Sequence, residues 1–329
     1  MPTLYVATQG ARIRKTSRRL LVSTDDAVLH SVRLRDVDRV VMAGSVELTS
    51  PALRALLEGR IETTFLSRGG RLLGSLSPPG GKNVFLRVAQ VQRYTNLEFR
   101  LRVGKSVVAA KILNGRRVLQ LFGRRRKELD LSATKAALES SAHKAAHAES
   151  VAQLMGIEGE AAATYFRAFG NLFLGDLRFE TRSRRPPRDP VNSLLSFGYT
   201  LLTGETIGAA FSEGLDPDVG FLHELSYGRP SLALDLVEEF RQPVVDRFVL
   251  SVINRRVIRP ADFTTEGEGV LLQDRPRGRF FEFYDRVMTS EFRDRSGQTV
   301  TYRSLLRAQA RQMARAVMNN EDYLPYRIP

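Results

Sequence analysis

The chain has 329 residues, and its 50 lysines and arginines outnumber its 36 aspartates and glutamates, giving a formal charge of +14. A composition of 43% hydrophobic and 8% aromatic residues is globular and excludes a largely disordered, collagen-like or coiled-coil chain. The absence of cysteine excludes disulfides, zinc fingers, iron–sulfur clusters and a thiol nucleophile. The basic excess favours a polyanionic partner, with nucleic acid first and an anionic membrane surface second. A basic surface kept for solubility is the alternative.

The N-terminal 15 residues show no basic segment ahead of an apolar core, so no secretory signal is expected. The longest apolar segment, residues 194–211, is interrupted by Gly198, Thr203 and Glu205 and is too short and polar for a membrane helix. We therefore expect a cytoplasmic protein with no membrane partner.

The first 76 residues predict a series of short strands, because segments rich in Val, Ile, Leu and Thr alternate with turn-forming residues. One helix interrupts this series at residues 50–59, where Pro51 takes the first turn and Gly59 ends it. We predict a small β-rich domain over residues 1–76. Its expected strands are 4–7, 19–23, 27–34, 39–42, 61–66 and 71–76.

Residues 77–82 (SPPGGK) predict a linker, because neither a helix nor a central strand tolerates consecutive prolines and glycines. Helical periodicity follows, starting at Phe85, Val88 and Val91. The sequence therefore predicts an α+β fold of two domains, the second mainly α-helical and spanning residues 83–329. Residues 83–127 carry much of the positive charge, with 12 basic residues and 1 acidic residue.

Asp235 and Glu238 are the first candidate chemical pair. Three residues apart on a predicted helix, they share one face and could hold a cation or a proton together. The alternative is that both carboxylates lie on a solvent-exposed helix face and have no chemical role. His223 favours the functional interpretation, because the Gly228–Pro230 turn could bring its imidazole back over the helix.

Glu158 is the second candidate, since it precedes an alanine-rich helix predicted at residues 160–169. A carboxylate at a helix N-terminus is stabilised by unpaired backbone N–H groups, so capping is an alternative role for it. Together, Glu158, His223 and Glu238 would form an oxygen-rich site with one imidazole, which suits Mg²⁺ or Mn²⁺.

Clusters of arginine are suited to phosphate binding, and Arg184 and Arg185 belong to one of them. Near the C-terminus, four arginines repeat every four residues and predict a stripe along one helix that would be costly without an anion. Its members are Arg303, Arg307, Arg311 and Arg315. Pairing of these arginines with acids of the same chain is the alternative. No Walker-type phosphate loop and no G-x-S-x-G serine motif are present.

Three segments in chain order resemble a known family: MGIEGEAAATYF, RRPPRDPVNSLLSFGYTLL and GFLHELSYGRPSLALDLVEEFRQPVVDRFVL. They are similar to the CRISPR-associated spacer-acquisition integrase, the first Cas protein. The β-domain, linker and α-domain layout also resembles that family, so the resemblance spans essentially the whole chain. SLALDLVEEFR resembles relatives from type I systems, in particular the I-C branch.

The resemblance implies a metal site formed by Glu158, His223 and Glu238, with Asp235 as an auxiliary acid beside it. Asn192, Tyr199 and Arg241 match further positions of the motif segments, and we expect them, with Arg184 and Arg185, to bind or position the DNA substrate. The implied activity is metal-dependent joining of spacer 3′-hydroxyl ends to the CRISPR repeat by transesterification. Water in place of the hydroxyl would make the same site an endonuclease.

The resemblance also implies partners: double-stranded DNA from spacer and repeat, a homodimer formed through the N-terminal β domain, and the second, smaller CRISPR-associated adaptation protein. Two other functions are compatible with the residues. One is a catalytically silent nucleic-acid-binding scaffold, and the other is a repair-type metal-dependent nuclease without integration. Convergence of Glu158, His223 and Glu238 on one point would distinguish an enzyme from the scaffold.

Overall fold

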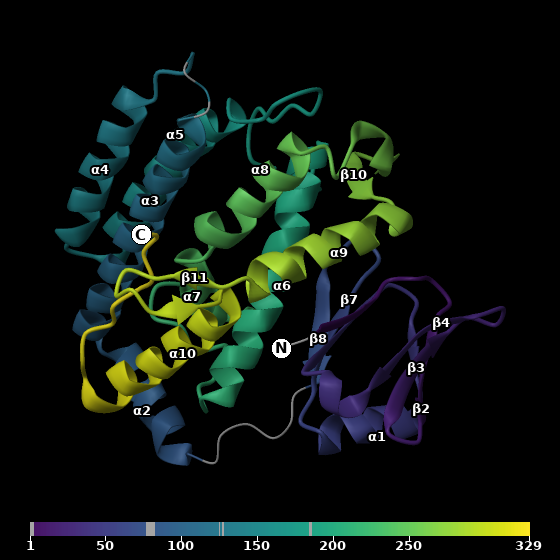
Figure 1. Ribbon diagram of the computed structural model, residues 1–329. Coiled ribbons are helices and arrows are strands. Elements are labelled where there is room, and N and C mark those ends of the chain that lie inside the picture. The colour runs from purple at the N-terminus through teal and green to yellow at the C-terminus, as the bar shows by residue number, and fades with distance from the viewer. Residues whose placement is uncertain (1–2, 77–82, 125, 127, 184–185) are drawn as a thin grey trace.

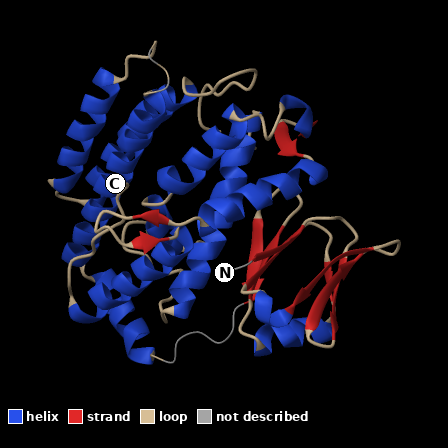
Figure 2. Cartoon of the chain, viewed as in Figure 1, coloured by secondary structure: helices blue, strands red, loops and turns tan. Residues whose placement is uncertain are grey.

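The computed structural model describes residues 3–76, 83–124, 126, 128–183 and 186–329. A strand-rich region comes first and a helical region follows, so the predicted α+β class is confirmed (Figures 1 and 2). The predicted linker 77–82, Arg184 and Arg185 lie outside the described residues. The domain limits themselves stay a prediction.

Two four-stranded sheets form the N-terminal region, with strand orders β1-β5-β7-β8 and β4-β3-β2-β6. In the first sheet β1, β5 and β7 run parallel and β8 is antiparallel to β7, whereas the second consists mainly of antiparallel pairs. The elements are β1 Thr3–Val6, β2 Arg12–Thr16, β3 Arg19–Ser23, β4 Val28–Arg33, β5 Arg39–Ala43, β6 Glu47–Leu48, α1 Ser50–Glu58, β7 Glu62–Leu66 and β8 Leu72–Leu76.

The first sheet is covered on both faces, which explains why every residue of β5 is buried. On one face Val40 and Met42 join a small core shared with the second sheet. On the other face Val41 and Ala43 join the large core of the helical region. Because successive side chains of a strand point to opposite faces of its sheet, β5 contributes to both cores and so connects the two regions.

Two described strands of the N-terminal region were missing from the sequence prediction, β2 and β6, as were the four short strands of the helical region. In β2 only Ile13 is buried, and the flanking basic residues are exposed, so the strand has a weak hydrophobic pattern. β6 has two residues and pairs in parallel with β2. These two strands are held by backbone hydrogen bonds to their neighbours, and their amino-acid composition gives no sign of that pairing.

The second region is built from helices with two short hairpins (Figure 2). Its helices are α2 Val84–Thr95, α3 Leu97–Gly123, α4 Ser132–Ala146, α5 Val151–Gly170, α6 Pro190–Ser212, α7 Ser231–Glu238, a π-helical turn Arg241–Asp246, α8 Arg247–Asn254, α9 Asp274–Thr289 and α10 Tyr302–Asn319. The hairpins are β9 Phe263–Glu266 with β10 Gly269–Leu272, and β11 Phe292–Arg293 with β12 Thr299–Val300.

Helix α6 runs through the middle of the helical region and is buried on almost every side (Figure 1). It starts sharply because the Asp189 side chain accepts the Asn192 N–H and Pro190 occupies the first turn. A helix that is apolar all round must be buried, here by protein. Among the described residues, no helix is long and apolar enough to cross a membrane.

Helix α2 forms where periodicity predicted it, but its apolar stripe faces outward. Val84, Phe85, Val88 and Val91 are all more than half exposed. The buried face carries Leu86 and the amide of Gln90, which donates to the carbonyls of residues 216 and 219. The hydrophobic periodicity therefore predicted the helix correctly, but it did not predict which face of the helix is buried.

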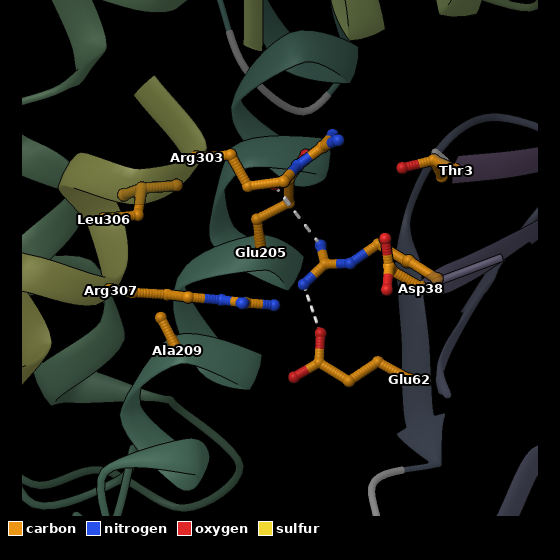
Figure 3. Close-up of a pocket in the computed structure, with 9 residues that line it drawn as sticks. Thr3, Asp38, Glu62, Glu205, Ala209, Arg303, Leu306 and Arg307 are labelled. Carbon is orange, nitrogen blue, oxygen red and sulfur yellow. Dashed lines mark hydrogen bonds and ion pairs between the residues drawn. The ribbon is translucent and has the colours of Figure 1, made fainter. Parts of the chain in front are cut away.

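A buried ionic network joins the two regions (Figure 3). Glu205 of α6 pairs with Arg303 of α10 through both carboxylate oxygens, at 2.9 and 3.0 Å. Arg39 of β5 lies 3.7 Å from Glu205 and pairs with Glu62 of β7. Glu205, Arg39 and Arg303 are almost fully buried, so each needs a partner of opposite charge.

The same network corrects the predicted phosphate-binding stripe on α10. Arg303 is 7% exposed and bound to acids of the chain, including Asp285 at 3.1 Å. Arg311 pairs with Glu213 at the end of α6. For Arg303 the prediction was wrong, because the side chain is buried among these acids, whereas phosphate binding by Arg311, whose side chain is 66% exposed, stays a prediction.

Replacing Glu205 with Ala should lower the free energy of unfolding by about 3 kcal/mol, because two buried guanidinium groups lose a shared partner. Glu213→Ala, directly after the same helix, removes a pair whose arginine is 66% exposed and should cost no more than about 1 kcal/mol. Urea unfolding followed by circular dichroism measures both. Equal losses in the two variants would contradict a structural role for the buried network.

Candidate active site

Glu158 lies in the middle of helix α5, which corrects the expectation that it precedes a helix. The helix begins at Val151, where the Ser150 side chain accepts the Gln153 N–H. Helix-capping by Glu158 is therefore excluded. Its carboxylate instead points to α3, where Oε1 accepts a charged hydrogen bond from the Lys111 ammonium.

Glu238, at the end of α7, reaches the same ammonium. Its Oε2 forms an ion pair with Lys111 Nζ, and its Oε1 lies 3.4 Å from the Arg241 guanidinium. Burial alone would raise the pKa of Glu238, but Lys111 and Arg241 lower it to about 2. The carboxylate is therefore ionised and buried, which only close cations make tolerable.

Asp235 is completely buried and holds the loop that carries His223. Its Oδ2 accepts the backbone N–H groups of Phe221 and Leu222, and its Oδ1 accepts that of His223. Oδ1 also lies 2.7 Å from His223 Nδ1. The loop folds the His223 imidazole back to helix α7, as expected, and the hydrogen bond to Asp235 fixes the orientation of the ring.

The Asp235 contact also sets the chemistry of the imidazole. A proton on Nδ1 shared with Asp235 leaves the lone pair of Nε2 available to a ligand. Burial alone would lower the pKa of His223, but its hydrogen bond to Asp235 and the charges of Asp235 and Glu238 raise it above its usual value.

Gly220 makes the Asp235 clamp possible. A Cβ atom there would lie 2.6 Å from the backbone carbon of Ser231 and 2.8 Å from Asp235 Oδ2. Any side chain would push the loop away from the start of α7. The glycine therefore belongs to the positioning of His223, without contacting the ring itself.

The donor set fits a hard divalent ion in part. Glu158 Oε1 and Glu238 Oε2 point at one position, where the Lys111 ammonium lies. Glu238 Oε2 is buried and, within the described residues, has no hydrogen-bond donor besides that ion-pair contact. However, no three His, Asp or Glu side chains in the described ranges lie close enough to hold a metal ion. Glu158 and Glu238 converge on Lys111, whereas His223 interacts with Glu238 only through its charge, so convergence of all three side chains on one point is not seen among the described residues.

Tyr199 and Arg241 form a stack next to the carboxylates. The Arg241 guanidinium lies over the Tyr199 ring at 4.0 Å from its centroid. The Tyr199 hydroxyl donates to Asp246, and the Tyr165 hydroxyl donates to the other oxygen of Asp246 at 2.8 Å. Arg241 is thus fixed between Glu238 and an aromatic ring, and its role toward DNA stays a prediction.

Asn192 is fully buried and organises the loop before α6. Its amide nitrogen donates to the carbonyl of Thr181 and to Asp189, and its oxygen accepts from the Ser183 N–H and from Arg182. These contacts occupy its polar atoms within the protein. A direct contact of Asn192 with substrate stays a prediction, and in this structure it positions the loop.

Lys111 and Asp246 are site residues that the sequence analysis missed. Lys111 is one of the 12 basic residues between positions 83 and 127, so nothing in the sequence singled it out. Asp246 interrupts the apolar run PVVDRFVL, which could have marked it as a buried acid. Burial raises its pKa from 3.8 to about 6, against the opposing hydrogen bonds of two tyrosines.

Known proteins that are similar to this chain identify its family. Residues 4–286 match the family model described as CRISPR associated protein Cas1. The chain belongs to the Cas1 family. The family resemblance noted in the sequence is therefore confirmed, whereas assignment to the I-C branch stays a prediction.

Curated relatives of this Cas1 family chain extend over nearly all of it. The chain is 42% identical over 84% of its length to "CRISPR-associated endonuclease Cas1 2" of Rhodospirillum rubrum, of which it covers 83%. It is 35% identical over 98% of its length to "CRISPR-associated endonuclease Cas1 3" of Thermus thermophilus, covering 94% of it. A Cas4 exonuclease/Cas1 endonuclease fusion of Rhodospirillum rubrum is 38% identical over 99% of the chain, which spans 57% of that longer protein.

Solved structures share this Cas1 fold. A Cas1 protein from Thermotoga maritima has a TM-score of 0.82 at 28% identity, with 97% of both chains covered. A casposase bound to integration product has a TM-score of 0.88 at 25% identity, covering 99% of this chain and 93% of that one. A Cas6-RT-Cas1–Cas2 complex has a TM-score of 0.83 at 28% identity, covering all of this chain and 36% of the other.

The raised pKa of Asp246 predicts a pH dependence of stability. Because the folded state favours the protonated acid, its contribution is fully present below 3.8 and is lost as the pH rises through about 6. Asp246→Asn cannot titrate, so the stability of the wild type relative to this variant should fall by about 3 kcal/mol between about pH 4 and pH 7.

Urea unfolding at several pH values measures this difference. Asn lacks one acceptor for the tyrosine hydroxyls, which adds a loss that does not vary with pH. Asp26→Asn, at an exposed position, is the control and should leave the wild-type profile unchanged. A profile for Asp246→Asn that parallels the wild type would contradict the buried-acid explanation.

Proposed function

We propose that this protein is a metal-dependent DNA integrase and endonuclease of CRISPR adaptation. The observation that carries the proposal is the convergence of Glu158 and Glu238 on one cation position, next to His223. These are the residues that the family resemblance assigns to the metal site; Glu158 comes from α5, Glu238 from α7 and His223 from the loop before α7. Membership of the Cas1 family and similarity to a casposase bound to integration product support integration over simple hydrolysis.

Glu158, Glu238 and His223 Nε2 would hold Mg²⁺ or Mn²⁺, since carboxylate oxygen and imidazole nitrogen suit these ions. A bound divalent ion would supply charge stabilisation at the phosphate of the target strand and at the attacking oxygen. Asp235 keeps the Nδ1 proton in place, so that His223 presents its other nitrogen. Gly220 and the loop N–H groups keep that presentation rigid.

In the proposed reaction, the 3′-hydroxyl oxygen of a spacer end attacks phosphorus in the repeat strand. The attacking hydroxyl loses its proton to water, a new phosphodiester bond forms, the bond to the 3′ oxygen of the repeat strand breaks, and that oxygen takes up a proton from water. Arg241, fixed by Glu238 and the Tyr199 ring, lies where a cation can orient the phosphate. Water in place of the spacer hydroxyl gives endonuclease cleavage.

The proposal includes the partners expected for this activity. Double-stranded spacer and repeat DNA fit the formal charge of +14. A homodimer formed through the strand-rich region is also proposed. The similarity to a Cas6-RT-Cas1–Cas2 complex supports the second, smaller adaptation protein as a partner.

A strand-transfer assay tests the proposal with a short duplex bearing free 3′-hydroxyls, a supercoiled plasmid carrying a repeat, and Mn²⁺. The wild type, with the partner protein, should join the duplex covalently to the plasmid. His223→Ala should reduce joining by at least about 100-fold, because the imidazole ligand is lost. His147→Ala, which removes an exposed imidazole at the end of α4, should retain joining.

The other outcomes distinguish the rival functions. Plasmid nicking without joining would identify a repair-type nuclease. DNA binding that is unchanged in His223→Ala, with no cleavage under any divalent ion, would identify a catalytically silent scaffold. Either result would contradict integration.

A further inference from the structure

Lys111 lies at the position that a divalent ion would need. Its ammonium contacts Glu158 Oε1 and Glu238 Oε2, which are the two carboxylate oxygens directed at the candidate metal position. The three side chains come from α3, α5 and α7. The lysine is 8% exposed, so its charge depends on these two acids for compensation.

The ammonium and a divalent ion cannot share this position. Mg²⁺ and Mn²⁺ require direct contact with the carboxylate oxygens, and Lys111 already contacts both. Arg241 supplies a second positive charge on Glu238. With Lys111 in place, the two acids are balanced by two bases, and a doubly charged ion would bring uncompensated positive charge into a buried site.

The lysine side chain has the means to leave. It is an ammonium on a flexible four-carbon stem, whereas the guanidinium of Arg241 is held over the Tyr199 ring. Glu158 keeps some solvent access, with 18% of its side chain exposed, and this gives the ammonium a route outward. Of the two cations, Lys111 is the exchangeable one.

We propose that Lys111 is a built-in counter-cation that holds Glu158 and Glu238 together in the metal-free protein and is displaced when a divalent ion binds. This inference rests on the proposed metal-dependent function and adds to it a residue that sets metal affinity. Metal binding is then an exchange of cations, and the released ammonium becomes available to the phosphate backbone beside the site.

Mn²⁺ binding to the full-length protein tests the exchange without any assay of activity. Free Mn²⁺ is measured by electron paramagnetic resonance during titration. Lys111→Met keeps an unbranched side chain that is one atom shorter and removes the competing charge, so it should bind Mn²⁺ at least about tenfold more tightly than the wild type. Lys105→Met removes one charge from the same helix and should stay within about twofold of the wild type.

Thermal unfolding gives a second readout. Without metal, Lys111→Met should unfold at a lower temperature than the wild type, because two buried carboxylates then face each other. Added Mn²⁺ should raise its unfolding temperature more than that of the wild type. Lys111→Gln, which keeps a donor amide without charge, provides the same comparison if the methionine variant does not fold.

The outcomes separate this inference from the function on which it rests. If the wild type binds Mn²⁺ and the uncharged variants bind it equally or more weakly, Lys111 does not compete with the ion and the inference is wrong. If neither the wild type nor any variant binds Mn²⁺, the metal-dependent function fails and the inference fails with it.

Discussion

The pairing of Glu158 and Glu238 with a single ammonium constrains how three helices of the helical region pack. Lys111 on α3 contacts both Glu158 on α5 and Glu238 on α7, and together with Arg241 it compensates the buried charge of Glu238. The three helices must therefore pack in one register. The close approach of α3 and α5 at Gly104, where a Cβ would lie 2.9 Å from Leu154, permits that register.

Buried polar groups around this centre follow the same rule of local compensation. Asp235 is saturated by three backbone N–H groups and an imidazole, and Asp246 by two tyrosine hydroxyls. Glu239, the neighbour of Glu238, accepts bonds from Tyr323 and from the backbone of residue 326 in the C-terminal segment. The C-terminal segment is thus attached to the end of α7 next to the site. The position of this segment is therefore coupled to that of the candidate metal ligand Glu238.

A second ionic network, around Glu205, connects the helical region to the strand-rich region. Helix α6 carries Glu205 on one side and Asn192 and Tyr199 closer to its start. One rigid helix therefore links the surface proposed for dimerisation to the candidate active site. An integrase that handles two DNAs needs such a fixed relation between its partner-binding surface and its reaction centre, because misplacement of reacting groups by about 1 Å is costly.

The sequence by itself determined the fold class, half of the described strands, several helices, and the candidate residues Glu158, His223 and Glu238, because periodicity and motif spacing are local properties. The tertiary structure decided what local patterns leave open: that Glu158 sits within α5, that the apolar stripe of α2 faces outward, and that Arg303 is an internal partner. It also brought Lys111 to the two acids across 47 and 127 residues of sequence. Contacts between distant segments depend on how helices pack, and burial then decides which charges must pair.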